Sequence, residues 1–267
     1  MNKKIAIIGG GNLGTAIAEG LIRSGFVAPG NILITKRNLS TIHYLQEKGV
    51  LVSNDNAEAL GFSDLVIIAV KPFQVNDVLG AIQPLFDESR HVLVSVITGI
   101  STSHIHDILN KKISTVRAMP NTAVAIQQSM TCISARDVTT DQLHYVKTLF
   151  EQLGKVVVIE EKLMEAATVL AACGTAYAMR YIRANIQGGI EIGFDAATAS
   201  LIAAQTVKGA AQLLLQKNTH PEHEIDKVTT PKGCTIAGLN EMEHQGFSSS
   251  LIKGIVASYD KIATDNK

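Results

Sequence analysis

The sequence has no excess charge of either sign. Its 267 residues include 24 lysines and arginines and 24 aspartates and glutamates, so the formal net charge is zero. A neutral surface has no general attraction for nucleic acid or for an anionic membrane, and we expect neither as a partner. The hydrophobic fraction of 46% is that of an ordinary globular protein, which excludes a disordered chain.

Cysteine is also scarce. Cys132, Cys173 and Cys234 are odd in number and far apart in the chain. Such spacing predicts neither a disulfide framework nor a CxxC metal site. A reducing compartment fits this composition best, and we expect a cytoplasmic location.

Long apolar runs are missing. No stretch of about 18 uncharged apolar residues occurs, so no membrane span is predicted. The richest segment, 198–215, is interrupted by Lys208. Lys3, Lys4 and the following apolar residues imitate a signal peptide, but the glycines at 9–11 break that apolar stretch. We therefore expect no secretion signal.

The first 160 residues alternate short β-branched runs with helical periodicity. We expect strands at 5–8, 32–35, 65–70, 92–96 and 156–159, and helices at 15–24, 40–48, 74–85, 103–109 and 140–153. Gly25, Gly49 and Gly154 follow three of these helices, where a left-handed residue is favoured. The alternation predicts an α/β fold with a Rossmann-type, doubly wound parallel sheet between two layers of helices.

From residue 161 onward the β-branched runs disappear. We expect long helices at 162–192 and 196–217, with Asp195 as an N-cap, and shorter ones at 235–244 and 248–262 after a break at 218–232. The chain is therefore predicted to form a Rossmann domain, 1–160, followed by an all-helical domain, 161–267. Residues 166–178 are apolar around most of their helix, and a helix of this kind must be covered. A partner subunit is the natural cover, which predicts a homodimer.

A glycine motif directly follows the first expected strand. Gly9-Gly10-Gly11-Asn12-Leu13-Gly14 satisfies G-x-G-x-x-G and leads into an expected helix. The glycines allow a tight turn, the approach of a pyrophosphate and close helix packing, and the helix N-terminus favours an anion. The motif predicts a dinucleotide site, with a glycine-rich loop that binds nothing as the alternative.

The end of the second expected strand has no carboxylate. NAD sites usually place Asp or Glu there to bind the ribose, whereas a 2′-phosphate requires cations. Lys36 and Arg37 occupy this position. They favour NADPH, with NADH as a weaker substitute, unless both are solvated surface charges.

Motifs for a metal centre or a nucleophile are absent from the sequence. His104 and His106 do not share a helix face, and His220 and His223 have no cysteine nearby, so we interpret all four as surface histidines. A zinc site usually needs four ligands, and no G-x-S-x-G elbow follows a strand. We expect no metal and assign the chemistry to the cofactor.

A glycine-containing turn at 229–235 precedes one of the C-terminal helices. Its free backbone amides, near Gly233 and the Thr235 hydroxyl, could bind a small carboxylate. The alternative is that Thr235 is a plain N-cap and Gly233 a turn residue.

These motifs resemble those of the pyrroline-5-carboxylate reductases, and the resemblance covers nearly the whole chain. The matching segments are 7–14, Ala69-Val70-Lys71-Pro72, Arg117-Ala118-Met119-Pro120-Asn121-Thr122 and 229–239. The resemblance implies reduction of L-1-pyrroline-5-carboxylate to L-proline with NADPH or NADH, the last step of proline biosynthesis. It also implies a helical domain that interlocks two subunits around the active site, with a higher oligomer of such dimers left open.

The resemblance also implies roles for individual residues. The cofactor-binding residues would be Gly9, Gly11, Asn12, Leu13, Gly14, Lys36, Arg37, Asn56, Ala69, Val70, Lys71, Pro72, Val96, Ile97 and Thr98. The substrate-binding residues would be Met119, Asn121, Gly233, Cys234 and Thr235. Thr168 would be the catalytic residue. Because a threonine hydroxyl is a poor acid, we interpret it as orienting the iminium or relaying a proton through water.

The sequence departs from the family pattern in two places. It has Ala-Ala-Cys-Gly-Thr-Ala-Tyr at 171–177 where the family commonly has Ser-Gly-Ser-Gly-Pro-Ala-Tyr. It has Lys232 where the family commonly has the first glycine of Pro-Gly-Gly. Lys232 could attract a carboxylate, or it could disturb the turn if that position needs a positive φ.

The expected mechanism is direct hydride transfer to the imine carbon, in which the protein contributes mainly orientation. One alternative is a related NADP-dependent imine or hydroxy-acid reductase. A hydroxy-acid enzyme would place a catalytic lysine on the long helix, and 165–177 contains none. Another alternative is a nucleotide-sensing protein that has lost catalysis, suggested by Ala171, Thr175 and Lys232.

Overall fold

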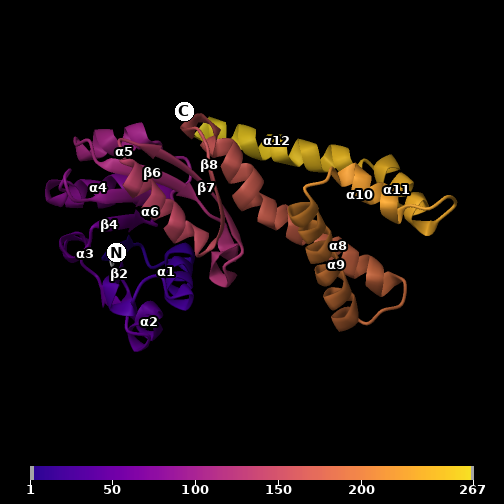
Figure 1. Cartoon of the computed structure of the whole chain (residues 1–267), viewed down its shortest axis with the longest axis horizontal. Helices are drawn as coiled ribbons and strands as arrows, with labels where there is room; N and C mark the ends of the chain where they lie inside the picture. The colour runs from indigo at the N-terminus through magenta and orange to yellow at the C-terminus, as the bar shows by residue number, and fades with distance from the viewer. Residues whose placement is uncertain (1–2, 266–267) are drawn as a thin grey trace. The chain divides into compact units, whose positions relative to one another are not determined.

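The computed structural model describes residues 3–265 of the chain, which forms two compact units (Figure 1). The first unit comprises Met1–Cys173 with Lys261–Lys267, and the second comprises Gly174–Asp260. The chain passes from one to the other inside a continuous helical stretch. Residues 161–173, which the sequence analysis places in the helical domain, are thus grouped with the sheet.

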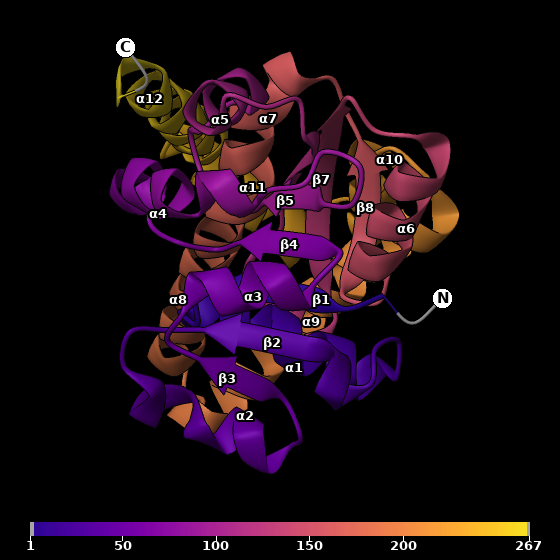
Figure 2. The same ribbon diagram turned by 90° about the vertical axis from the view of Figure 1, so that its left-hand side faces the viewer.

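An eight-stranded sheet forms the centre of the first unit (Figure 2). The strands are β1 (Ile5–Ile8), β2 (Ile32–Thr35), β3 (Leu51–Ser53), β4 (Leu65–Ile68), β5 (Val92–Ser95), β6 (Ser114–Met119), β7 (Ser129–Arg136) and β8 (Gly154–Val158). Their order is β3-β2-β1-β4-β5-β6-β7-β8. All neighbours are parallel except β6 and β7, and Ile7 pairs with Ile34 on one side and Ile67 on the other. The predicted Rossmann-type fold is confirmed.

Helices connect these strands. The α-helices of the first unit are α1 (Asn12–Ser24), α2 (His43–Glu47), α3 (Asn56–Phe62), α4 (Val75–Ile82), α5 (Thr102–Leu109), α6 (Thr140–Glu151) and α7 (Met164–Ala167). Short 3₁₀ turns include η3 (Pro72–Gln74), η5 (Thr122–Ile126) and η6 (Glu161–Leu163), and η7 (Thr168–Cys173) is a π-helix. The helix that the sequence predicts over 162–192 is therefore interrupted by a π-helical turn.

The central strands are buried on both faces, whereas the edge strands β3 and β8 are partly exposed. Successive side chains of a strand point to opposite faces, so Ile7 joins one hydrophobic cluster and Ile8 the other. Helices α1 and α6 complete the first cluster with Leu21 and Phe150, whereas α4 contributes Leu79 to the second. Near-continuous apolar runs are typical of parallel strands covered on both faces, which is why the Ile- and Val-rich strands were predictable.

The second unit is entirely helical. It contains α8 (Gly174–Glu191), α9 (Ala196–Lys217), α10 (Pro221–Val228), α11 (Cys234–His244) and most of α12 (Phe247–Asp265). Asp195 accepts hydrogen bonds from the backbone amides of Ala197 and Thr198, each at 3.0 Å, which confirms it as the N-cap of α9.

Three strands and two helices differ from the sequence prediction. β3, β6 and β7 were not predicted, because β3 has three residues and the other two contain Ser, Thr and Arg rather than an apolar run. Helix α3 was also missed. The prediction that 218–232 is a break between helices is wrong, because α10 occupies the middle of this segment. Its N-cap is His220, and Pro221 lies in its first turn. Proline is compatible with a helix start because the first amides need no partner within the helix.

Candidate functional site

A cavity of about 1020 Å³ lies at the carboxyl ends of six strands of the first unit. Segments that follow β1, β2, β3, β4, β5 and β6 line it. The lining residues are 8–13, 35–38, Asn54, Asn56, 69–72, Gln74, Asp77, Val78, 96–98, 120–122 and Ala172. The strand order reverses between β1 and β4, and open α/β sheets bind ligands in the crevice at such a switch point.

The glycine loop after β1 shapes one side of this cavity. Gly9 has a φ of 116°, and a Cβ there would lie 2.5 Å from the Ala69 carbonyl oxygen. A Cβ on Gly14 would overlap the Gly9 carbonyl oxygen, so both glycines are needed for the close approach of β1, β4 and α1. A Cβ on Gly11 would meet nothing within 4 Å. The backbone therefore leaves open space at the start of α1.

The N-terminus of α1 presents free backbone amides to this space. Its N-cap is Gly11, which provides no side-chain cap, and the first turn holds no acidic residue. The first amides of a helix have no partner within the helix, and the helix dipole favours an anion there. The loop and helix start consequently fit a pyrophosphate.

Two cations line the cavity after β2, where a dinucleotide bound at the glycine loop would place its adenosine. Lys36 and Arg37 follow β2 and line the cavity, and neither forms an ion pair within the described part of the chain. Asn56 also lines it, where its side-chain oxygen accepts a hydrogen bond from the Thr35 hydroxyl at 2.6 Å. The end of β2 thus offers positive charge and amide groups, which suits a phosphorylated ribose.

The opposite end of the cavity is formed by 96–98 after β5, by Pro120 and Asn121 after β6, and by Ala172. Both polar atoms of the Asn121 side chain already have partners. Oδ1 accepts a hydrogen bond from the Ala123 amide at 3.0 Å, and Nδ2 donates to the Ala171 carbonyl oxygen at 3.0 Å. Asn121 therefore joins the end of β6 to the π-helix η7. Met119 is buried and does not line the cavity.

Thr168 begins η7. Its side chain is buried, and its hydroxyl donates to the Met164 carbonyl oxygen at 2.9 Å. It is not among the residues that line the cavity, whereas Ala172 in the same π-helix is. Short π-helical segments inside helices occur frequently at functional sites.

The turn at 230–233 lies in the second unit. Gly233 is the N-cap of α11 and its amide donates to the Thr230 carbonyl oxygen at 2.9 Å. No side chain caps α11, so the alternative that Thr235 is its N-cap is wrong. Lys232 has a φ of 62°, which is the positive value that would strain a side chain. Gly14 and Met119 in the first unit, and Gly233, Cys234 and Thr235 here, are thus the predicted binding residues outside the cavity lining.

Sequence reasoning missed several lining residues. They are Ile8, Gly10, Thr35, Asn38, Asn54, Gln74, Asp77, Val78, Pro120, Thr122 and Ala172. Asn54 follows the unpredicted strand β3, so recognition of that strand would have found it. Gln74 and Asp77 lie at the start of the helical segment after β4, a position that the carboxyl-end rule identifies once β4 is known.

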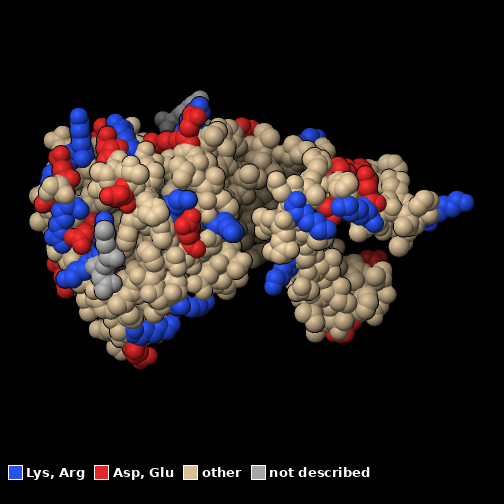
Figure 3. Space-filling model, in the orientation of Figure 1, with Lys and Arg blue, Asp and Glu red and all other residues tan. Residues whose placement is uncertain are grey.

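Figure 3 shows acidic and basic side chains interspersed over the first unit. Among residues 3–265, no group of three or more His, Cys, Asp or Glu side chains is arranged to hold a metal ion. Within the same range, every helix is too short or too polar to cross a membrane.

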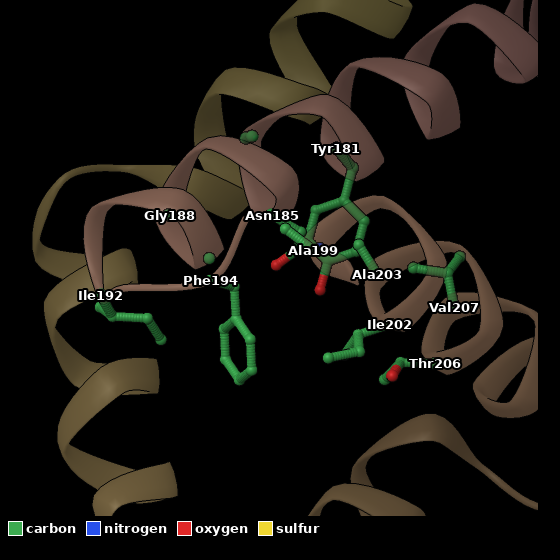
Figure 4. Close-up of a pocket in the computed structure, with 12 residues that line it drawn as sticks. Tyr181, Asn185, Gly188, Ile192, Phe194, Ala199, Ile202, Ala203, Thr206 and Val207 are labelled. Carbon is green, nitrogen blue, oxygen red and sulfur yellow. The ribbon is translucent and has the colours of Figure 1, made fainter. Parts of the chain in front are cut away.

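The second unit contains an apolar groove of about 500 Å³ between α8 and α9. It is lined by Tyr181, Ala184, Asn185, Gly188, Gly189, Ile192, Phe194, Ala199, Ile202, Ala203, Thr206 and Val207. In Figure 4, Ile192, Phe194 and Ile202 project toward the same open space. Exposed apolar patches of this kind mark interaction surfaces.

Two family models match the chain. The model described as pyrroline-5-carboxylate reductase dimerisation matches residues 161–264. The model described as NADP oxidoreductase coenzyme F420-dependent matches residues 4–99, which hold the glycine loop and the two cations.

Curated relatives match over nearly the full chain. A pyrroline-5-carboxylate reductase 2 of Dictyostelium discoideum is 45% identical, covering 97% of this chain and 92% of the relative. The pyrroline-5-carboxylate reductase of Synechocystis is 36% identical, covering 97% of each. Pyrroline-5-carboxylate reductase 1 of Dictyostelium discoideum is 49% identical, and this chain spans about half (49%) of its length.

Solved structures agree in fold. The pyrroline-5-carboxylate reductase of Coxiella burnetii has a TM-score of 0.91 at 28% identity, covering 99% of this chain and 98% of that one. The pyrroline carboxylate reductase of Plasmodium falciparum, solved with NADP bound, has a TM-score of 0.91 at 23% identity and covers 100% and 99% of the two chains. This second likeness concerns the fold alone.

Proposed function

The chain belongs to the pyrroline-5-carboxylate reductase family, and we propose that it reduces L-1-pyrroline-5-carboxylate to L-proline with NADPH. The observation that carries the proposal is the cavity at the carboxyl ends of the strands. One end of it combines an uncapped helix start with Lys36 and Arg37, and the other end is lined by Ala172 of the π-helix η7, which begins with Thr168.

NADPH is held, in this proposal, by the residues that the sequence analysis assigns to it. The amides at 11–13 bind the pyrophosphate, Lys36 and Arg37 bind the 2′-phosphate, and 69–72 with 96–98 line the rest of the dinucleotide. When bound, NADPH supplies a hydride to the imine carbon of the substrate. NADH lacks the 2′-phosphate, and we expect weaker binding.

The chain's own residues orient the substrate and supply no strong acid. As the imine carbon gains a hydride, the π electrons of the C=N bond move to the ring nitrogen, which carries one proton from solvent. The Thr168 hydroxyl is assigned to that nitrogen as an orienting or relaying group, since a threonine cannot act as a strong acid. In this role the hydroxyl must leave the Met164 carbonyl oxygen, to which it donates at 2.9 Å. Hydride transfer within an ordered complex gains mainly from alignment of the reacting carbons.

The substrate carboxylate is assigned to the turn before α11. The amides of Cys234 and Thr235 start a helix that no side chain caps, so they are free to bind an anion, whereas the Gly233 amide donates to the Thr230 carbonyl oxygen. Met119 is buried, and the Asn121 side-chain amide donates to the Ala171 carbonyl oxygen of η7, so we assign both residues a supporting role.

The active protein is proposed to be a homodimer. Its second unit has an apolar groove between α8 and α9, and the family model for dimerisation matches this part of the chain. A second copy would bury Ile192, Phe194 and Ile202. A cytoplasmic location is proposed from the three cysteines, all of which are free.

The test is a spectrophotometric assay of NADPH oxidation with L-1-pyrroline-5-carboxylate. We expect turnover with NADPH and a higher KM with NADH. Oxidation only with a different cyclic imine or with a β-keto acid substrate would identify a related reductase. Tight NADPH binding without oxidation of any of these would identify a nucleotide-sensing protein instead.

A further inference from the structure

Arg117 is a charged residue in the middle of the sheet. It lies on β6, where it pairs with Ser95 of β5 on one side and Ser134 of β7 on the other. Its side chain is only 3% exposed. A buried guanidinium cannot lose its charge, so it must be paired where it lies.

Two glutamates at the start of the helix that leads into η7 pair with Arg117. Nη1 donates to Glu161 Oε1 at 3.2 Å, and Nη2 donates to Glu165 Oε1 at 3.3 Å. Glu161 also accepts hydrogen bonds from the backbone amide and the hydroxyl of Thr102, at 2.7 and 2.6 Å. Desolvation raises the pKa of Glu161, but the hydrogen bonds from Thr102 and Arg117 outweigh it and lower that pKa. The carboxylate is therefore ionised and balances the buried cation.

Stability alone gives no reason for this arrangement. A buried ion pair is often no more stabilising than apolar residues of the same volume. In addition, Arg117 Nε and the hydroxyls of Ser95 and Ser134 are buried among the described residues without a hydrogen-bond partner. The two ion pairs instead fix the positions of the carboxylates, because a planar guanidinium binds each carboxylate in a defined geometry.

The segment that Arg117 fixes is the one that carries the proposed catalytic threonine. Glu165 lies three residues before Thr168, at the helical spacing that places side chains on neighbouring turns. The far end of the same segment is held from the same strand, since Asn121 follows β6 and donates to the Ala171 carbonyl oxygen at 3.0 Å. Residues 161–171 are thus tied to β6 at both ends, with Thr168 between the ties.

We propose that Arg117 is a positioning residue, which holds η7 against the cavity through Glu161 and Glu165 and so sets the place of Thr168 and Ala172. The expected effect on kcat rests on the proposed function. The expected effect on structure, an ordered π-helical turn, does not depend on which reaction is catalysed.

Four variants test the proposal. Arg117→Met removes both ion pairs, Arg117→Lys restores a single charge, and Glu165→Ala removes one tie from a side chain that is 24% exposed. Glu160→Ala is the matched control, because Glu160 pairs with Lys162 in the same region but both side chains are exposed to solvent.

We expect Arg117→Met and Glu165→Ala to lower kcat for pyrroline-5-carboxylate reduction by between about 10-fold and 100-fold, as a misplacement of about 1 Å does. The Kd for NADPH, measured by fluorescence titration, should stay within about 2-fold, because 9–13 and 36–37 form no hydrogen bond or ion pair with Arg117 or Glu165. Arg117→Lys should recover part of kcat, and Glu160→Ala should keep all of it. If Arg117→Met fails to fold, the kcat of Glu165→Ala alone tests the proposal.

Hydrogen–deuterium exchange of NADPH-bound wild type and variants provides the second readout. Amides of 168–173 should exchange faster in Arg117→Met and Glu165→Ala, while those of the strands remain protected. Unchanged exchange in this segment, or unchanged kcat in a folded Glu165→Ala, would overturn the proposal. If the wild type does not reduce the substrate at all, the proposed function fails, and the exchange comparison still decides whether Arg117 orders η7.

Discussion

The two units of this chain bury their apolar residues in different ways. In the first unit, two hydrophobic clusters cover both faces of the sheet, and whole strands such as β1 and β4 are buried. In the second unit, Ala199 and Ala203 are the buried apolar residues among those described. The first unit has a complete core within one chain. The second exposes the apolar side chains that a core would contain, so we expect its stability to depend on a partner surface.

Polar residues follow the same division. The first unit buries charged and titratable groups such as Arg117 and His91, each with defined partners. In the described part of the second unit, no polar or charged residue falls in the buried class. We therefore expect nucleotide binding and acid sensitivity to belong to the first unit, and assembly to belong to the second.

The sharpest test of this division is a charge placed in the α8–α9 groove. Ile202 lines the groove and is 46% exposed. Ile202→Asp would bury an unpaired carboxylate on dimerisation, and we expect the dimer Kd to rise by about 100-fold or more, or about 3 kcal/mol. Sedimentation velocity measures the shift to monomer.

The matched control is Leu85→Asp in the first unit, where the side chain is 49% exposed. That variant should remain dimeric. The wild-type unfolding midpoint should rise with protein concentration, as it does when folding and association are linked. A dimer that survives Ile202→Asp would refute the groove as the interface.

Cofactor preference should respond to a change in the first unit only. Arg37→Asp replaces a cation at the end of β2, and we expect NADPH binding to weaken by about 1.5–3 kcal/mol, roughly 10- to 150-fold. NADH should bind as well as before or better. Fluorescence titration gives both Kd values, with Lys112→Asp as a control of equal charge change on an exposed residue. Equal NADPH affinity in Arg37→Asp and wild type would exclude Arg37 as a phosphate ligand.

Substrate binding should respond to a change in the second unit. Thr235→Ala should lower kcat/KM by roughly 10- to 150-fold if its hydroxyl or the turn it supports binds the carboxylate, which corresponds to about 1.5–3 kcal/mol. NADPH affinity should not change. The thermal midpoint should also hold, because Thr235 does not cap α11. Unaltered kinetics would remove Thr235 from the substrate site.

A smaller effect is expected at Lys232, whose φ of 62° is unfavourable for a residue with a side chain. Lys232→Gly should raise the free energy of unfolding by about 1 kcal/mol. A residue with a side chain pays about 1–2 kcal/mol for the left-handed conformation, which glycine avoids. Part of that gain is offset because glycine loses more backbone entropy on folding. Asn218→Gly is the control, because Asn218 also has a positive φ, 51°, but asparagine tolerates it. A rise in KM for the substrate would show, in addition, that the lysine charge attracts the carboxylate.

The smallest effect is a pH dependence of the first unit. Burial lowers the pKa of His91, whose Nδ1 accepts a hydrogen bond from the Asp87 amide at 3.0 Å. The unfolded chain then binds the proton more readily, so stability is present above about pH 6.5 and falls as the pH decreases below it. Urea unfolding between pH 5 and 8 should show this slope, and His91→Gln should flatten it. An unchanged slope would assign the acid sensitivity to other groups.

The parts of the fold that could be predicted are those in which one local signal suffices. Four of the five predicted strands, β1, β2, β4 and β5, are buried along their whole length, and parallel strands of this kind are continuous apolar runs. The fifth, β8, is a partly exposed edge strand that was predicted from its run of valines. The glycine loop and the two cations after β2 were predictable because their spacing from the strands is fixed. β6 and β7 were missed because they carry Arg117, Ser134 and other polar residues. The burial of these polar residues is explained only by their partners elsewhere in the chain.

The sequence by itself determined the Rossmann-type sheet, the helical region after residue 160 and the chemical character of the nucleotide site. Hydrophobic periodicity and glycine spacing are local properties, so they can be read without coordinates. Tertiary structure alone decided that Arg117 pairs with glutamates more than 40 positions away and that Asn121 holds η7. Both depend on which distant groups meet after folding, and burial makes such contacts decisive because an unpaired polar group inside the protein is costly.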